Sequence, residues 1–342
     1  MRARLAFLAL LVLLATVAAA GSQGARPAPL RHVFLIMLEN HSQGAVVGNP
    51  NAPFITRLAR TYGRAAGYLG VTHPSQPNYV ALFSGSNWWL NSDSPANRYN
   101  HTNLVDQLEA HHFTWAAYME SMPKTGYLGP VYPPNTGLYV NRHNPFILFR
   151  DVRRSATRRW HIKPYTQFAR DMRKRNVPNF VWISPNLCHD MHGTHGPPCP
   201  KGYNNPADNS LKRNADAFVL RAVRTIMASP AWKQPSVIFI LSDESTENGN
   251  PVNGGYISAA ACCDSPVLPA GSPWPQWTGG PLGGGSAVAV IVANRGKRHY
   301  VNHTKYNHYS VLATIEHAWG LGYLVYAADS RQVPRMDVFL RR

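Results

Sequence analysis

Hydrophobic and polar positions divide the chain into short apolar runs that alternate with amphipathic segments. Apolar runs of strand length, typical of strands buried on both faces, occupy His32–Leu38, Phe113–Tyr118, Asn179–Ser184, Ser236–Leu241 and Ser286–Val292. Helical patterns lie at Pro53–Tyr62, Asn103–His111, Tyr165–Arg175, Leu211–Met227 and Ser310–Gly320. Strands that alternate with helices predict an α/β fold, with a mostly parallel central sheet and helices on both faces.

The beginning of the chain has a different pattern. Arg2 and Arg4 precede the apolar run Leu5–Val17, and three alanines follow it. This arrangement is typical of a cleaved secretory signal, and the run is too short for a spanning helix. An uncleaved membrane anchor is the alternative. We therefore expect a signal peptide at 1–20, a flexible lead-in at 21–31 and a single domain at 32–342, secreted or held in the cell envelope.

Composition narrows the class of partner. The formal net charge is +17, and loss of Arg2 and Arg4 with the signal peptide leaves +15. A strongly basic surface favours anionic partners such as phosphorylated small molecules, lipid headgroups or an anionic cell envelope. The basic residues are spread along the chain and form no motif that reads nucleic acid. We therefore expect no specific nucleic-acid partner.

The four cysteines suggest disulfides in an exported chain. They are Cys188, Cys199, Cys262 and Cys263, and four cysteines allow three full pairings. A bond between Cys188 and Cys199 is favoured because it would close a small loop around a histidine-rich segment. The spacing matches no common zinc motif, which makes a cysteine-based zinc site the weaker interpretation.

Polar side chains follow three of the predicted strands. Glu39 and Asn40 come after the first, Asp190 and His192 after the third, and Asp243 and Glu244 after the fourth. Ligands of parallel sheets bind beyond the carboxyl ends of the strands, so we expect these side chains to converge. A single carboxylate at a strand end is often a helix cap. Three such clusters favour a site for a divalent cation, which prefers carboxylate and imidazole ligands.

Three long loops rich in glycine and proline lie beside these strand ends. They occupy Gly126–Asn144, Gly193–Asn205 and Gly249–Gly285. Long irregular segments in a compact domain are usually functional or disordered. We therefore expect these loops to form the walls of a site.

Ser75 lies between Pro74 and Pro77, shortly before a helical pattern predicted from Asn78. A hydroxyl near a helix start sits where backbone N–H groups and the helix dipole favour a phosphate. An N-cap is the simpler role for such a serine. Without a metal ion or a base, serine is a poor nucleophile. A catalytic role for Ser75 therefore depends on the predicted cation site.

Several motifs together resemble the bacterial phosphoesterase family, which includes secreted acid phosphatases, phosphatidylinositol-3-phosphatase-like enzymes and phospholipases C. The motifs are Glu39–Ser42, Gly48–Pro53, Thr72–Tyr79 with Phe83–Ser86, Pro185–His192, Ala215–Phe218, Asp243–Glu244 and Asn307–Leu312. They span most of the chain after the signal peptide, and Thr72–Tyr79 favours the phosphatase branch. The family is in turn distantly similar to the alkaline phosphatase superfamily, so the resemblance implies an alkaline-phosphatase-like fold.

The resemblance also implies roles for individual residues. Ser75 would be the nucleophile, Asn78 a donor that orients the phosphate, and His73 or His189 the group that protonates the leaving alcohol. The metal that activates Ser75 would be bound by Glu39, Asn40, Asp243 and Glu244. Asp190, His192 and His308 are candidates for a second metal or for phosphate contacts. Asn40 stands where wider superfamily members usually have Asp, which leaves the divalent metal unidentified.

We expect from these features a secreted, metal-dependent phosphomonoesterase that works through a phosphoserine intermediate. Its substrates would be small phosphorylated metabolites or phosphoinositide-type headgroups. A phospholipase C-type phosphodiesterase is the first alternative. A basic, non-catalytic envelope-binding protein is the second, although pure binding does not require the set Glu39, Ser75, Asp243 and Glu244. The natural substrate and the oligomeric state stay open at this stage.

Overall fold

The computed structural model describes residues 30–201, 206–245, 265–272 and 282–341, with positions 275, 277, 279 and 280 between the last two ranges. The predicted signal peptide, most of the lead-in and Cys262 and Cys263 lie outside the described residues. Among those described, no helix combines the length and the apolar character needed to cross a membrane.

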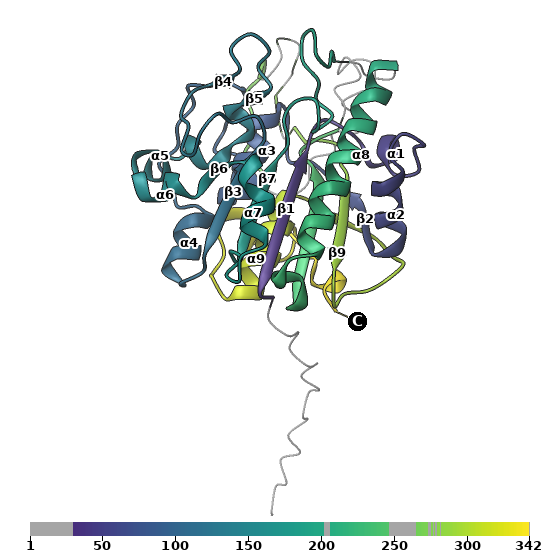
Figure 1. Cartoon of the computed structure of the whole chain (residues 1–342). Coiled ribbons are helices and arrows are strands. Elements are labelled where there is room, and N and C mark those ends of the chain that lie inside the picture. Colours follow the sequence, from purple (N-terminus) through teal and green to yellow (C-terminus); the bar gives the residue numbers. More distant parts are fainter. Residues whose placement is uncertain are drawn as a thin grey trace, which may run out of the picture.

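An eight-stranded sheet forms the centre of the fold (Figure 1), in the order β10-β2-β9-β8-β1-β7-β3-β6. Its strands are β1 (His32–Leu38), β2 (Gly63–Tyr68), β3 (Trp115–Met119), β6 (Ile162–Pro164), β7 (Phe180–Ser184), β8 (Ser236–Ser242), β9 (Ala289–Ala293) and β10 (Tyr300–Tyr306). Every pair is parallel except those of β9, which runs antiparallel to β2 and β8. The short strands β4 (Val131–Tyr132) and β5 (Tyr139–Val140) form a separate hairpin. The predicted mostly parallel sheet is confirmed.

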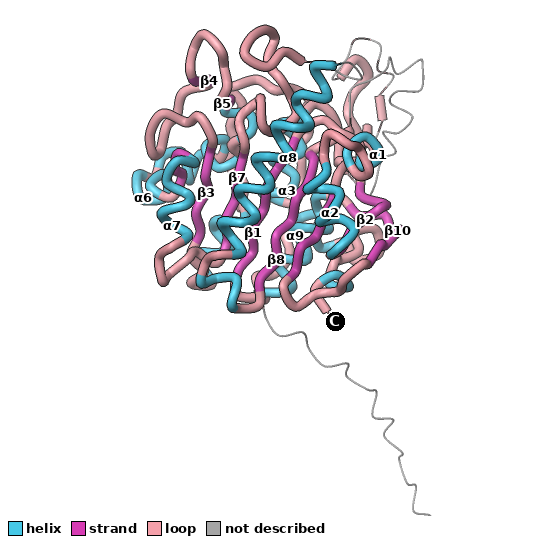
Figure 2. The backbone as a smooth tube through the Cα atoms, turned by 45° about the vertical axis from the view of Figure 1, so that its right-hand side comes forward, coloured by secondary structure: helices cyan, strands magenta, loops and turns pink. Residues whose placement is uncertain are grey.

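Helices cover both faces of this sheet. The main ones are α1 (Gln43–Val46), α2 (Pro53–Thr61), α3 (Ser75–Ser84), α4 (Leu104–Ala110), α5 (Arg150–Arg154), α6 (Ala156–Trp160), α7 (Phe168–Met172), α8 (Pro206–Met227) and α9 (His308–Trp319). Helices α2, α7 and α8 share one core with the sheet, and α3, α4 and α9 share the other. Figure 2 shows α8 and α2 in front of the strands, with α3 and α9 behind.

The alternation of side chains along β1 explains how one strand serves two cores. Val33, Leu35 and Met37 pack on the face of α3 and α9, while Phe34, Ile36 and Leu38 pack on the face of α8. All six are fully buried. Full burial of one such side chain is worth about 1.5–3 kcal/mol, so a continuous apolar run is the expected sequence for a central strand.

Besides the two short strands of the hairpin, the sequence pattern misses three strands of the central sheet, each for a different reason. Strand β2 (Gly63–Tyr68) is rich in small residues, and β6 (Ile162–Pro164) is only three residues long. Strand β10 (Tyr300–Tyr306) lies at an edge and keeps most of its polar side chains exposed. These segments form strands because they pair with neighbouring strands, since their own hydrophobicity is too low to predict a strand. Helix α3 also starts at Ser75 and not at the predicted Asn78.

Gly70 lies in close contact with two other segments of main chain, Gly284–Gly285 and Asp243–Glu244. Its N–H donates to the carbonyl of Gly285 at 2.8 Å, and its own carbonyl accepts from the N–H of Gly284 at 3.0 Å. A Cβ at position 70 would lie 2.7 Å from the carbonyl oxygen of Asp243 and 3.0 Å from Cα of Glu244. Both neighbours are main-chain atoms, so a side chain here would displace the segment that carries Asp243.

We predict that Gly70→Ala destabilises the protein by about 1–3 kcal/mol, the usual cost of an inserted methyl group in a packed region. Thermal unfolding measures this loss. Gly44→Ala is the matched control, because a Cβ at Gly44 has nothing within 4 Å. Equal unfolding temperatures for the two variants would show that the backbone at Gly70 has room to spare.

Candidate active site

The carboxyl ends of three neighbouring strands meet at Glu39. Strand β1 lies between β7 and β8, so the segments that follow these strands are side by side. The N–H of Glu39 donates to the carbonyl of Asp190 at 2.7 Å, and the N–H of Asp243 donates to the carbonyl of Leu38 at 3.1 Å. Asn40 has a φ of 41°, a left-handed conformation that Asn tolerates better than most residues. The predicted convergence of the strand-end clusters is thus visible in the backbone.

Ser75 lies against this group from the first position of α3. Its hydroxyl donates to Oε2 of Glu39 at 2.9 Å and lies 3.4 Å from Oδ1 of Asn40. The side chain is almost fully buried, as are those of Glu39 and Asn40. A serine hydroxyl at a helix start, bonded to a carboxylate that can accept its proton, has the arrangement of an activated nucleophile.

Asp243 and Glu244 complete the side of the site that follows β8. Oδ1 of Asp243 accepts from the backbone N–H of Asn40 at 2.9 Å, and Oε1 of Glu244 accepts from its side-chain amide at 3.4 Å. Oε2 of Glu244 lies 2.9 Å from Nδ1 of His73. The predicted residues Glu39, Asn40, His73, Ser75, Asp243 and Glu244 therefore form one connected, buried cluster.

Asn78 has its side-chain amide occupied by the loop that precedes Ser75. Its Oδ1 accepts from the N–H groups of Val71 at 2.8 Å and Thr72 at 3.1 Å. Its Nδ2 donates to the carbonyl of Thr72 at 2.8 Å and to Oε2 of Glu244 at 3.1 Å. Both polar atoms of the Asn78 side chain therefore contact the loop before Ser75, and one of them also contacts Glu244. The donation from Asn78 to a phosphate stays a prediction.

His143 joins the cluster from the short 3-10 helix Asn141–His143. Its Nε2 lies 3.2 Å from Oε1 of Glu39, and its Nδ1 lies 3.3 Å from Oδ2 of Asp190. One ligand atom from each of these three buried residues lies within 4.8 Å of the others, which is the spacing of a metal site. The triad contains two predicted ligands, Glu39 and Asp190, and one histidine that sequence reasoning missed.

Tyr79 and Arg142 are two further residues that sequence reasoning missed. The hydroxyl of Tyr79 donates to Oε1 of Glu39, and its ring stacks on His143 with centroids 5.2 Å apart. Arg142 precedes His143, and its Nη2 lies 3.3 Å from Nε2 of His192. The loop 126–144 is predicted as a wall of the site. Its run of polar residues, Asn141-Arg142-His143-Asn144, was the signal in the sequence that could have identified Arg142 and His143 as site residues.

Three histidines that the sequence predicts for the site, His308, His192 and His189, have their ring nitrogens in contact with other protein groups. In His308, Nδ1 lies 2.6 Å from the Tyr68 hydroxyl and Nε2 2.5 Å from the carbonyl of Asp243, so both ring nitrogens are engaged. In His192, Nδ1 lies 2.7 Å from the carbonyl of Gly193, and Arg142 takes the other nitrogen. His189 stands apart from Ser75: its Nδ1 lies 2.9 Å from both carboxylate oxygens of Glu120, and its ring stacks on Phe218.

A second layer of buried polar groups holds the end of β1 to α8. Nδ1 of His41 lies 3.0 Å from the carbonyl of Glu39, and its Nε2 lies 2.7 Å from Oδ1 of Asp208. The other oxygen of Asp208 accepts from Nζ of Lys212 at 2.5 Å. These contacts hold the main chain at Glu39 in place. They join residues far apart in the sequence, so only the tertiary structure shows them.

Burial and mutual repulsion disfavour negative charge on the clustered acids. Burial raises the pKa of Glu39 well above its usual range, and repulsion from Asp243 and Asp190 raises it further. Burial likewise raises the pKa of Asp190 well above normal, and it raises that of Asp243 to about 7. Burial lowers the pKa of His73 to about 3, so its imidazole is neutral. Without a further cation, some of these acids would therefore be protonated in the folded protein.

Unsatisfied ligand atoms indicate what would balance this charge. Oδ2 of Asp243, Oδ2 of Asp190 and Nε2 of His143 are buried without a hydrogen bond of proper geometry among the described residues. Buried polar atoms of this kind are usually satisfied, and each one left bare costs about 1–3 kcal/mol. Carboxylate oxygens and imidazole nitrogens suit a divalent cation. The residues present thus fit a metal site centred on Glu39.

A disulfide supports the segment that carries Asp190 and His192. Cys188 and Cys199 are bonded, with Cα atoms 5.5 Å apart, as the sequence favoured. The bond closes a loop of 11 residues in separation, and the N–H of Gly193 donates back to the carbonyl of Leu187 at 2.7 Å. Closing such a loop restricts the unfolded chain and so stabilises this wall of the site.

Similarity to solved structures is confined to the fold. A protein of the alkaline phosphatase superfamily from Vibrio parahaemolyticus superposes with a TM-score of 0.50 at 10% identity, covering 88% of this chain and 68% of the other. Murine ectonucleotide pyrophosphatase/phosphodiesterase 5 superposes with a TM-score of 0.53 at 9% identity, covering 88% and 98%. The predicted alkaline-phosphatase-like fold is confirmed.

Similarity in sequence is closer. The phosphate-repressible acid phosphatase of Penicillium chrysogenum is 34% identical over 148 residues, 41% of this chain and 35% of that protein. The phosphatidylinositol-3-phosphatase of Mycobacterium tuberculosis is 32% identical over 162 residues, 47% and 51% of the two chains. The matched region thus spans about a third to a half of these relatives. The model of the Phosphoesterase family matches residues 49–322, and the chain belongs to this family.

Proposed function

We propose that this protein is a metal-dependent phosphomonoesterase with Ser75 as its nucleophile. The observation that carries the proposal is the hydrogen bond from Ser75 to Glu39, inside a buried cluster of carboxylates with bare ligand atoms. Support comes from the relatives named acid phosphatase and phosphatidylinositol-3-phosphatase. The substrate class is a phosphate monoester, on a small metabolite or on a phosphoinositide-type headgroup. Secretion is part of the proposal and rests on the sequence of residues 1–20 alone.

Two overlapping sets of residues could hold divalent cations. Glu39, Asn40 and Asp243 surround Ser75, while Glu39, His143 and Asp190 form the triad on the other side. Glu39 belongs to both, since one of its carboxylate oxygens contacts Ser75 and the other contacts His143. A bound divalent cation would lower the pKa of the serine hydroxyl and neutralise charge on the phosphate.

In the first step, Ser75 is the attacking group and Glu39 is the group that takes up its proton. Oγ of Ser75 forms a bond to phosphorus as its proton passes to Glu39. The bond from phosphorus to the alcohol oxygen breaks, and the alcohol leaves with a proton from solvent. Water then attacks phosphorus and loses a proton to solvent, the bond from phosphorus to Oγ breaks, and Glu39 returns its proton to Oγ, so that inorganic phosphate and free Ser75 result. His73 is neutral, which disfavours it as the acid for the alcohol, and we propose that it orients Glu244.

Arg142 is the residue we assign to phosphate binding. Its side chain is 21% exposed, whereas Glu39 and Asp190 are buried. Its Nε makes no hydrogen bond among the described residues and has only a loose ion pair with Asp93, whose Oδ2 lies 3.8 Å away. Its charge lowers the pKa of both Glu39 and Asp190, which places it close to the cluster. A guanidinium group that faces both solvent and the reacting centre suits a doubly charged phosphate.

We expect Ser75→Ala to reduce hydrolysis of p-nitrophenyl phosphate by at least about 1,000-fold, because the nucleophile is gone. Ser94→Ala is the control, since the Ser94 hydroxyl accepts from the N–H of Ala96 at 3.3 Å and makes no hydrogen bond with the Glu39 cluster among the described residues. Chelation should remove the activity of the wild-type protein, and a divalent metal should restore it.

Preference for bis-p-nitrophenyl phosphate would favour a phosphodiesterase. Absence of turnover with every divalent metal would favour a non-catalytic binding protein.

Chelated protein should lose stability as pH rises. The pKa of Asp243 is raised from its ordinary 3.8 to about 7, so the folded state binds this proton more tightly than the unfolded chain does. The resulting stability is present at about pH 4 and is lost as pH rises through about 7. Thermal unfolding from acid to neutral pH should show this fall, and Asp243→Asn should flatten it. An added divalent cation should raise the unfolding temperature at neutral pH; a cation without effect there would contradict the metal site.

Arg142→Met should raise the KM for p-nitrophenyl phosphate by about 10- to 100-fold, the range expected when a charged hydrogen bond to phosphate is lost. Arg142→Lys should keep part of the affinity, because a charge remains. Arg150→Met serves as the control, since Arg150 is exposed on α5. A KM unchanged in Arg142→Met would remove Arg142 from the substrate site.

A further inference from the structure

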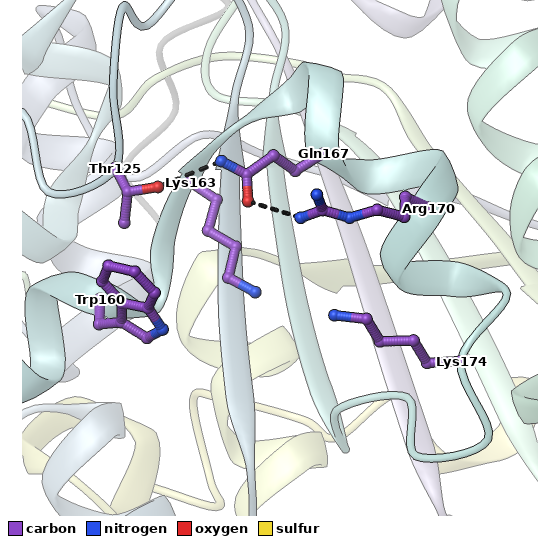
Figure 3. A pocket seen from close by; sticks show the side chains of 6 residues that line it. All are labelled: Thr125, Trp160, Lys163, Gln167, Arg170 and Lys174. Carbon is purple, nitrogen blue, oxygen red and sulfur yellow. Dashed lines mark hydrogen bonds between the residues drawn. The ribbon is translucent and has the colours of Figure 1, made fainter.

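A basic hollow lies at the edge of the sheet, three strands away from β1. It has a volume of about 330 Å³ and is lined by Thr125, Trp160, Lys163, Gln167, Arg170 and Lys174 (Figure 3). We call it the Trp160 basin. Strand β6, which carries Lys163, is the edge strand, separated from β1 by β7 and β3. At about 4.8 Å per strand the basin is roughly 14 Å from the Glu39 cluster, so it is a separate feature.

Three cations converge in this basin. Lys163, Arg170 and Lys174 extend their charged ends into the same space, below Gln167 and beside Trp160 (Figure 3). One acid, Asp171, pairs with all three: Nζ of Lys163 lies 2.8 Å, Nζ of Lys174 2.7 Å and Nε of Arg170 3.5 Å from its carboxylate oxygens. Its side chain is 4% exposed, whereas those of Arg170 and Lys174 are 62% and 56% exposed. The surface of the basin therefore presents an excess of positive charge to solvent.

The polar residues that line the basin are suited to binding an anion and include no catalytic base among the described residues. Nε2 of Gln167 donates to the Thr125 hydroxyl at 3.2 Å, and Nη2 of Arg170 donates to Oε1 of Gln167 at 3.1 Å. These bonds hold the guanidinium of Arg170 over the hollow. Within the described part of the chain, the lining contains neither a carboxylate nor a histidine that could act as a base. An anion with hydrogen-bond acceptors, above all a phosphate group, matches this lining.

Trp160 indicates what the anion is attached to. Its side chain ends α6 and is 70% exposed, a large apolar surface that a free phosphate ion would not use. Indole rings next to lysine and arginine are typical of the interface between a membrane and water. Lys124, Arg173 and Arg175, which neighbour the lining residues in the chain, are exposed as well. This flank thus combines an interfacial aromatic residue with a broad positive field.

We propose that the Trp160 basin docks the protein on a membrane surface by binding the phosphate group of an anionic phospholipid. Lys163, Arg170 and Lys174 would contact the phosphate, while Trp160 enters the headgroup layer. The proposal goes beyond hydrolysis at Ser75 and does not depend on it. A chain that docks in this way would keep its catalytic cluster close to a surface rich in phosphate esters.

Sedimentation with phosphatidylcholine vesicles, with and without phosphatidylserine, tests the proposal. The full chain should bind the anionic vesicles, less tightly at high salt, and bind neutral vesicles weakly. The variant Trp160→Ala/Arg170→Gln/Lys174→Gln should lose at least about tenfold in affinity, since each basic residue contributes to attraction by an anionic surface. Lys163 stays unchanged in this variant because it neutralises the buried Asp171.

The matched control is Arg60→Gln/Arg64→Gln, which removes the same charge from a second hollow at the opposite edge of the sheet. It should change vesicle affinity by less than about twofold if binding is local to the basin. Equal losses in the two variants would mean that net charge alone attracts the protein, and the basin would have no special role. Full binding by the basin variant would overturn the proposal as well.

Fluorescence and thermal unfolding distinguish lipid docking from a site for free anions and from loss of the fold. Inorganic phosphate that alters the fluorescence of the full chain, but not of Trp160→Phe, without any binding to vesicles would show a site for free anions and refute lipid docking. Thermal unfolding checks that each variant is folded, and Trp160→Ala alone, at an exposed position, tests docking if the triple variant is unstable. Because neither readout uses catalysis, failure of the proposed phosphatase activity would leave this result interpretable.

Discussion

The burial of four carboxylates in one place is the constraint on which the site depends. Glu39, Asp190, Asp243 and Glu244 are all nearly inaccessible to solvent and lie at the ends of three adjacent strands. A cluster of this kind is costly unless protons or cations balance it, because charges separated from water interact strongly. The raised pKa values of three of these acids are the local sign of that cost. The same imbalance makes the cluster receptive to a divalent cation.

The strand order places the residues of the cluster around Glu39. Because β1 lies between β7 and β8, Glu39 contacts residues from both neighbours and from α3. Its two carboxylate oxygens then face different partners, Ser75 on one side and His143 with Tyr79 on the other. The proposed proton transfer from Ser75 and the proposed metal binding would therefore both involve this one side chain. A change in the position of Glu39 would affect both.

Several residues of the family motifs contact the main chain around this arrangement. Asn78 fixes the loop before Ser75, and His308 holds the carbonyl of Asp243 with one nitrogen. His41 reaches the carbonyl of Glu39 and is itself held by Asp208. Positioning of this kind matters because small displacements of a reacting group reduce rates strongly. Motif membership by itself does not distinguish such residues from those that touch the substrate.

The sequence alone was sufficient for the α/β fold, the central strands and most of one half of the site. Continuous apolar runs mark strands buried on both faces, and the polar residues after them fall at one edge of a parallel sheet for any order of strands. Glu39, Asn40, Asp243 and Glu244 could therefore be grouped in advance, and Ser75 was added by the resemblance to the phosphoesterase family. Strand β10 and β2 could not be found, because their pairing and not their hydrophobicity makes them strands.

Only the tertiary structure decided which histidine completes the cluster and which ones do not. His143 lies in a loop about a hundred residues from Glu39, and its ring is placed by stacking on Tyr79 and by contact with Asp190. His308 and His192 have the right residue type, but their ring nitrogens are already engaged. Whether a nitrogen is free depends on neighbours brought together by folding, and a linear pattern carries no record of them.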